Sequence, residues 1–98
     1  MFARFSKKPI TIKELSEQVV RQVKRNAQTL MHRQVYYRYI EVFLSEADFE
    51  YWLPFRDQLI EQLKQELSRQ IMNKDEPYQP VLDIFRAENN KTHISGGF

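Results

Sequence analysis

Few residues in this chain are of the types that catalyse reactions or bind metals, and their spacing fits neither role. The chain contains no cysteine, which excludes thiolate nucleophiles, disulfides and cysteine-based zinc sites. Its two histidines, His32 and His93, are far apart and belong to no H-E-x-x-H motif. The only glycines are the adjacent Gly96 and Gly97, so a glycine-rich phosphate-binding loop is ruled out. We therefore expect no enzymatic activity, no metal and no cofactor.

Charge is divided unevenly along the chain. Residues 1–38 contain nine Lys and Arg and two acids, a net charge of +7, whereas residues 39–98 contain six bases and eleven acids, a net charge of −5. A basic surface of this kind attracts nucleic acid, anionic lipid or an acidic protein. The positive charge falls into two patches, which suits an acidic protein partner better than a nucleic-acid backbone. One patch lies in the first eight residues, and the other comprises Arg21, Lys24, Arg25 and Arg33.

The length of the chain, 98 residues, allows one domain with one modest core. We expect a flexible basic leader over residues 1–10 and a single α+β domain over 11–98. No apolar run approaches the roughly 20 residues that span a bilayer, and the start lacks the apolar segment of a secretory signal. These features predict a cytoplasmic protein without a transmembrane segment, and the inner face of the membrane is the alternative location.

A helix and a strand are predicted in the first half of the domain. Thr11 and Glu14 have the spacing of a capping box, and apolar residues then recur every three or four positions, which predicts a helix over 12–31. The β-branched and aromatic residues that follow predict a strand over 35–44. Alternation places Ile40, Val42 and Leu44 on the core face of this strand, and Tyr37, Tyr39, Glu41 and Phe43 on its other face.

Two helices and two strands are predicted in the second half. Proline does not fit a helix interior, so Pro54 separates a short helix over 46–53 from a long helix over 54–73. A strand follows over 81–86, and a short third strand near 92–95 would form a hairpin with it. Strands joined through a helix usually pair in parallel with a right-handed crossover.

The order of these elements predicts a small α-β-α-α-β-β sandwich with a three-stranded mixed sheet. The long helix would cover one face of the sheet. The N-terminal helix would cover the other face and bury Tyr37, Tyr39 and Phe43, because an amphipathic helix needs a partner face. In the alternative arrangement these rings stay exposed beside Arg38 as a platform for stacking nucleic-acid bases.

Residues 39–50, with the sequence YIEVFLSEADFE, resemble the Y-x-V-x-L-S-x-x-D-F/Y-E stretch of a bacterial domain. That domain precedes a forkhead-associated (FHA) phosphothreonine-binding domain in FhaA-type signalling proteins. A long helix, an aromatic-proline loop and a strand over 81–85 follow in the same order. The family ends near T-G-x-F, whereas here three residues separate Thr92 from the glycines. The resemblance covers about 35–98 and, more loosely, 10–34.

The resemblance implies a non-catalytic adaptor domain in Ser/Thr-kinase signalling, with kinase-pathway or cell-envelope proteins as partners. It also implies a linker and an FHA domain downstream, so no phosphothreonine-binding site transfers to these residues. We therefore expect a protein-interaction domain. The alternative is a small nucleic-acid-binding domain that uses the basic N-terminal segment and the Tyr37/Tyr39 strand face. The expected interaction surface consists of Arg21, Lys24, Arg25, Arg33, Tyr37, Tyr39 and Phe43.

Overall fold

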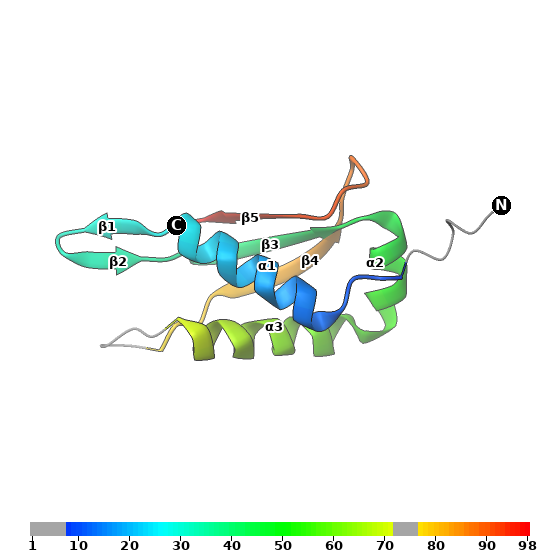
Figure 1. The fold of residues 1–98 in the computed structure, drawn as a ribbon, viewed down its shortest axis with the longest axis horizontal. Helices are drawn as coiled ribbons and strands as arrows, with labels where there is room; N and C mark the ends of the chain where they lie inside the picture. Colours follow the sequence, from blue (N-terminus) through cyan, green and yellow to red (C-terminus); the bar gives the residue numbers. More distant parts are fainter. Residues whose placement is uncertain (1–7, 72–76) are drawn as a thin grey trace.

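A computed structural model of the chain describes residues 8–71 and 77–98. Most of the predicted leader and part of the loop predicted after the long helix lie outside the described residues. The α+β class and the three-stranded mixed sheet are confirmed (Figure 1). The elements in chain order are α1 (Ile12–Arg25), β1 (Gln28–Leu30), β2 (Arg33–Val35), β3 (Tyr39–Leu44), α2 (Glu46–Trp52), the 3-10 turn η2 (Leu53–Phe55), α3 (Arg56–Gln70), β4 (Val81–Arg86) and β5 (His93–Gly97).

Helix α1 begins at the predicted capping box and ends six residues earlier than predicted. The Thr11 hydroxyl accepts the Glu14 amide proton at 3.1 Å, and the Glu14 carboxylate accepts the Thr11 amide proton at 3.1 Å. At the other end, Asn26 closes the helix because its side-chain amide donates to the Gln22 carbonyl at 2.8 Å. The helix therefore stops before residue 27.

The residues predicted as the last turns of that helix form the β1–β2 hairpin instead. Met31 and His32 have positive φ angles of 50° and 69°, as a two-residue hairpin turn with matching twist requires. Asn-Gly is the usual sequence for such a turn. Because Met31 and His32 stand there instead, nothing in the sequence indicated a turn. His32 therefore lies at the hairpin tip and not at a helix end, and Val35 belongs to β2 rather than to β3.

The three-stranded sheet has the order β4-β3-β5. Strands β3 and β4 are parallel, as predicted, with Tyr39 opposite Val81. The prediction that the last strand forms a hairpin with β4 is wrong, because β5 pairs antiparallel with β3. The loop from β4 to β5 is held across the end of β3. There the Ser45 amide donates to the Thr92 hydroxyl at 3.1 Å, and the Glu46 amide donates to the Asn90 side chain at 2.7 Å.

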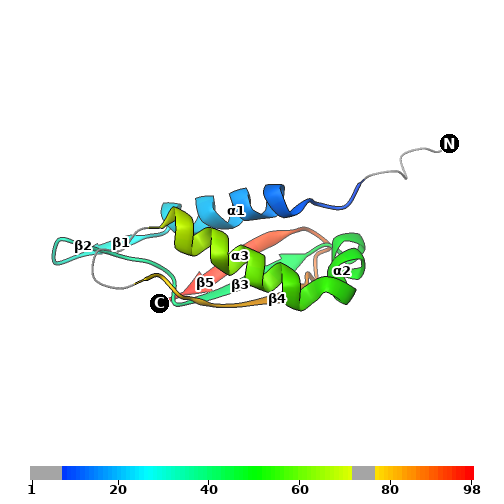
Figure 2. The ribbon, with the colours of Figure 1, turned by 90° about the horizontal axis from the view of Figure 1, so that it is seen from below.

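Both long helices lie on the same face of the sheet, side by side (Figure 2). The prediction that the N-terminal helix covers the other face is wrong. Its entry is fixed on the helical side, because Ile10 accepts a hydrogen bond from the Trp52 indole at 2.9 Å and donates its amide proton to Asp48 at 3.1 Å. The buried stripes of the two helices meet the predicted core face of β3: Leu15, Val19 and Val23 from α1, Leu59, Leu63 and Leu67 from α3, and Ile40, Val42 and Leu44 from β3.

Tyrosine side chains close the core where β3 begins. The Tyr78 hydroxyl donates to the Tyr37 carbonyl at 2.6 Å, and the Ser68 hydroxyl donates to the Tyr78 carbonyl at 2.8 Å. Burial, together with the nearby Tyr36 and Tyr37, raises the pKa of Tyr78 above its ordinary value. The Tyr37 ring lies against Gly96, where an added Cβ would approach it to 2.3 Å. Only glycine leaves room for this ring.

The free edge of β4 is capped by side chains. Val81 and Ala87 donate their amide protons toward β3, so the backbone groups of Ile84 point the other way. The Ile84 amide donates to the Asp83 carboxylate at 2.8 Å, and its carbonyl accepts from the Arg56 guanidinium at 3.2 and 3.3 Å. Arg56 also forms an ion pair with Asp83. Side chains therefore satisfy the middle of this edge.

Candidate interaction surface

The face of the sheet opposite the helices is open over the described residues, since no other described element packs on it. Alternation sends every second side chain of each strand to this face, and the strand register aligns them in three rows. The rows, each written from β4 through β3 to β5, are Val81–Tyr39–Gly97, Asp83–Glu41–Ser95 and Phe85–Phe43–His93.

The last row is a continuous aromatic surface. The Phe43 ring lies parallel to the His93 imidazole, with centroids 4.7 Å apart, and 5.5 Å from the Phe85 ring. The Nδ1 atom of His93 is 2.8 Å from the Lys91 carbonyl, which can only accept, so Nδ1 carries the proton. This hydrogen bond holds the imidazole against Phe43. The row thus presents three rings at one end of the face.

The other two rows differ in chemistry. The first is apolar and exposed, with Tyr39 at 53% and Val81 at 59% of their accessible surface. The middle row is acidic. Its Asp83 is paired with Arg56, whereas the Glu41 side chain is exposed and makes no hydrogen bond or ion pair with the other described residues. The face therefore presents a carboxylate between two apolar rows.

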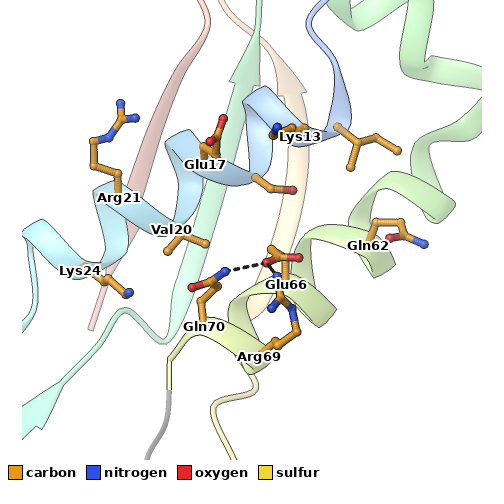
Figure 3. A pocket seen from close by; sticks show the side chains of 11 residues that line it. Lys13, Glu17, Val20, Arg21, Lys24, Gln62, Glu66, Arg69 and Gln70 are labelled. Carbon is orange, nitrogen blue, oxygen red and sulfur yellow. Dashed lines mark hydrogen bonds and ion pairs between the residues drawn. The ribbon is translucent and has the colours of Figure 1, made fainter.

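On the helical side, α1 and α3 form a groove of about 770 Å³ (Figure 3). Val20 contributes an apolar side chain, and Lys24 lines the same groove. On α3, Glu66 accepts a hydrogen bond from Gln70 at 3.0 Å and pairs with Arg69. The Gln70 hydrogen bond, aided by Arg69, lowers the pKa of the Glu66 carboxyl. Both signs of charge therefore line the groove, with four basic and two acidic side chains: Lys13, Arg21, Lys24 and Arg69, and Glu17 and Glu66.

The residues predicted to form one interaction surface lie in different parts of the fold. Tyr37 is buried, because the bend at Arg38 interrupts the strand alternation and leaves the ring against Gly96. Phe85 and Asp83 complete the open face and were missed, although alternation within the predicted strand over 81–86 placed them on one side. Of the other predicted residues, Arg21 and Lys24 line the helical groove, Arg25 ends α1, Arg33 lies in β2, and Tyr39 and Phe43 share the open face.

The described residues contain no cluster that resembles a metal or membrane-spanning site. Within 8–71 and 77–98, no group of three or more His, Asp or Glu side chains is placed to hold a metal ion. None of the helices in these two ranges combines the length and apolarity that a membrane span requires. The open sheet face and the helical groove are two candidate surfaces for recognition in this part of the chain.

Comparison with known protein families agrees with the resemblance in sequence. A family model described as FhaA, N-terminal domain, matches residues 1–84. The matched region contains α1, the hairpin, β3, α2, α3 and most of β4, whereas β5 lies beyond it. Comparisons with curated proteins and with solved structures yield no match. Because the family model covers most of the chain, the chain belongs to the FhaA N-terminal domain family.

Proposed function

We propose that this domain is a non-catalytic protein-interaction module of an FhaA-type signalling protein, and that the open sheet face is its docking surface. The observation that carries the proposal is the exposure of Tyr39, Val81 and Phe85 on a face where no other described element packs. Exposed apolar surface rimmed by polar residues is typical of protein-binding sites. Aromatic side chains are also enriched among the residues that dominate binding energy.

The three rows define the chemistry of the partner. Successive rows are two residues apart along a strand, about 7 Å. A partner that presents a Lys or Arg between two apolar side chains at this spacing would match the apolar, acidic and apolar rows. Glu41 would pair with the partner's cation, and Phe43 and Tyr39 would contact its apolar groups.

The acidic middle row of the open face weighs against the nucleic-acid alternative. A stacking platform needs cationic neighbours that attract phosphate, whereas Glu41 lies at the centre of this face. Tyr37, the second tyrosine of the predicted platform, is buried. The family supports a protein partner from a kinase pathway or the cell envelope, and with it a location on the cytoplasmic side of the membrane.

Site-specific photo-crosslinking in cells tests this proposal. We would replace Phe85 with a photo-reactive phenylalanine and, as the matched control, Tyr51, an exposed aromatic residue of α2. We expect a protein crosslink from position 85 and none from position 51. The crosslink should disappear in Glu41→Lys, because a partner cation would then meet a like charge.

Two results would contradict the proposal: equal crosslinking from both positions, or crosslinking that Glu41→Lys leaves unchanged. Salt-dependent binding of single-stranded nucleic acid that is lost in Tyr39→Ala would instead favour the alternative function. That binding can be measured by fluorescence anisotropy at low ionic strength.

A further inference from the structure

The edge of β5 lacks the protection that the edge of β4 has. On β4, Arg56 and Asp83 occupy the backbone groups of Ile84. Strand β5 lies at the opposite edge of the sheet (Figure 1) and contains no Lys, Arg, Asp, Glu or Pro, residue types that commonly block an edge strand. Among the described residues, β3 is the only strand that pairs with β5. The other side of β5 is therefore open to pairing with an additional strand.

Backbone groups that point away from β3 line this edge. The Ala87 amide donates to the Leu44 carbonyl, so the even-numbered residues of β3 bond to β4 and the odd-numbered ones to β5. The residues of β5 opposite these odd-numbered positions are His93, Ser95 and Gly97. The amides and carbonyls of Ile94 and Gly96 consequently point outward, and no described residue forms a hydrogen bond with them. Donors and acceptors at this spacing fit the backbone of an extended segment.

Small residues of β5 leave space on the open face. Ser95 lies opposite Glu41, and Gly97 lies opposite Tyr39. A Cβ added at Gly97 would meet no atom within 4 Å apart from its chain neighbours. Gly96 and Gly97 border a hollow of about 390 Å³ together with Tyr39 and Glu41. Side chains on a strand next to β5 can therefore extend over β5 toward β3.

Charge determines which side chain fits the middle row of the open face. The Glu41 side chain is exposed and makes no ion pair with another described residue. Adjacent strands are about 5 Å apart, so a residue beside Ser95 on an added strand is about 10 Å from the Glu41 backbone. The long side chain of a Lys or Arg and that of Glu41 together span this distance. A cation at this position would neutralise a carboxylate that no described residue pairs.

We propose that an extended segment of the protein partner adds to the sheet as a strand beside β5. A Lys or Arg of this segment lies beside Ser95, and apolar residues two positions to either side lie beside His93 and Gly97. Main-chain hydrogen bonds supply affinity in this mode of binding, and alternate side chains supply specificity. This inference rests on the proposed function, because it takes the same partner and names the form in which that partner binds.

A second copy of this chain fits the edge less well than a cationic segment. Its own β5 would present His93, Ser95 and Gly97 on the open face, without a Lys or Arg for Glu41. Pairing through the two β5 strands would also place the acidic rows of both copies in one continuous sheet. Like charges in one sheet are unfavourable. Charge complementarity therefore favours a partner segment over self-association.

Amide hydrogen exchange, measured by NMR on the full chain, tests the backbone pairing. The probe is the synthetic peptide acetyl-Thr-Val-Thr-Lys-Thr-Val-Thr-amide, in which valine, lysine and valine share one side of a strand. At saturating peptide, the amides of Ile94 and Gly96 should exchange at least roughly tenfold more slowly. The Ser95 amide bonds to β3 in the free domain and should change little, so it is the internal control. Unchanged exchange at Ile94 and Gly96 overturns the proposal.

Exchanging charge between domain and peptide tests the position of the cation. Replacing the central lysine with glutamate should weaken binding roughly fivefold or more, as measured by NMR titration. Glu41→Lys should reverse this preference. Glu61→Lys makes the same charge change at an exposed position of α3, so it is the matched control and should keep the preference for lysine. Equal affinity of the wild type for both peptides, or no binding at millimolar peptide, overturns the proposal.

Three outcomes separate this inference from the proposed function and from self-association. A protein crosslink from position 85 with unchanged exchange at Ile94 and Gly96 would uphold the open face as a docking surface and overturn strand addition. The absence of both the crosslink and the protection would overturn both. Protection of the two amides that rises with domain concentration in the absence of peptide, with a dimer in analytical ultracentrifugation, would assign the edge to a second copy and overturn the partner strand.

Discussion

The two faces of the three-stranded sheet are built from the same strands and differ in almost every other respect. Ile40, Val42 and Leu44 of β3 are completely or almost completely buried under two helices, whereas Tyr39 and Glu41 of the same strand are exposed. The face under the helices supplies the core of the domain. The other face keeps apolar side chains that the core does not need, so selection for stability alone does not account for them.

A pair of aliphatic substitutions in β4 is the strongest test of the difference between the covered and the open face of the sheet. Ile84→Ala removes a buried side chain from the covered face and should cost about 2–5 kcal/mol of unfolding free energy. Val81→Ala acts on the open face and should cost less than about 0.5 kcal/mol. Urea denaturation measures both. Similar costs for the two would show that the open face is covered in solution.

The two glycines of β5 provide a second pair. Gly96 faces the helical side, where a new Cβ would meet the Tyr37 ring, so Gly96→Ala should destabilise the fold by about 1–3 kcal/mol. Gly97 has open space at its Cβ position, and Gly97→Ala should change stability by less than about 0.5 kcal/mol. Thermal unfolding compares the two variants. An equal effect would mean that strand propensity, not the Tyr37 contact, determines the cost.

The smallest predicted effect concerns the hydroxyls of Tyr78 and Tyr39. Tyr78→Phe loses the hydrogen bond to the Tyr37 carbonyl and should cost about 0.5–1.5 kcal/mol near pH 7. Tyr39→Phe, on the open face, should be neutral within about 0.5 kcal/mol. Urea denaturation near pH 7 tests both substitutions.

Tyr78 also predicts a pH dependence. Its pKa is raised in the folded chain above the ordinary value of 10.0, so the folded state holds this proton more tightly. The resulting stability is fully present below that ordinary value and is lost as the pH rises past it. The wild type should therefore lose stability above about pH 10, and Tyr78→Phe should lose less. An identical loss of stability in both proteins would mean that titratable groups other than Tyr78 cause it.

The sheet and its core could be predicted from the sequence because alternation is a local signal. The pattern of residues 40–44 identified the buried face of β3, and Pro54 placed the break between α2 and α3. Parallel pairing of β3 with β4 followed from the helical crossover. The buried face and the helix break depend on few residues close together in the chain, whereas the pairing follows from a general rule for strands joined through a helix.

The errors arose at one local signal, the end of α1, and at contacts between distant residues. Ala27 and Leu30 continue the helical spacing of α1, but Asn26 caps the helix and the hairpin turn lacks the usual Asn-Gly. The side of the sheet that α1 occupies depends on Ile10 and its bonds to α2, which no periodicity encodes. The side that α1 occupies also decides which residues share a surface: the sheet lies between Arg21 and Lys24 in the helical groove and Tyr39 and Phe43 on the open face.

The capped edge of β4 has a consequence for the behaviour of the domain at high concentration. An exposed edge strand is a template for another chain, and pairing there leads to fibrils or domain exchange. An incoming strand would have to displace Arg56 and Asp83 from the backbone of Ile84 before it could form its central hydrogen bonds. The ion pair thereby protects the sheet from open-ended growth through β4 and leaves the domain free to present an apolar face without polymerising along that edge.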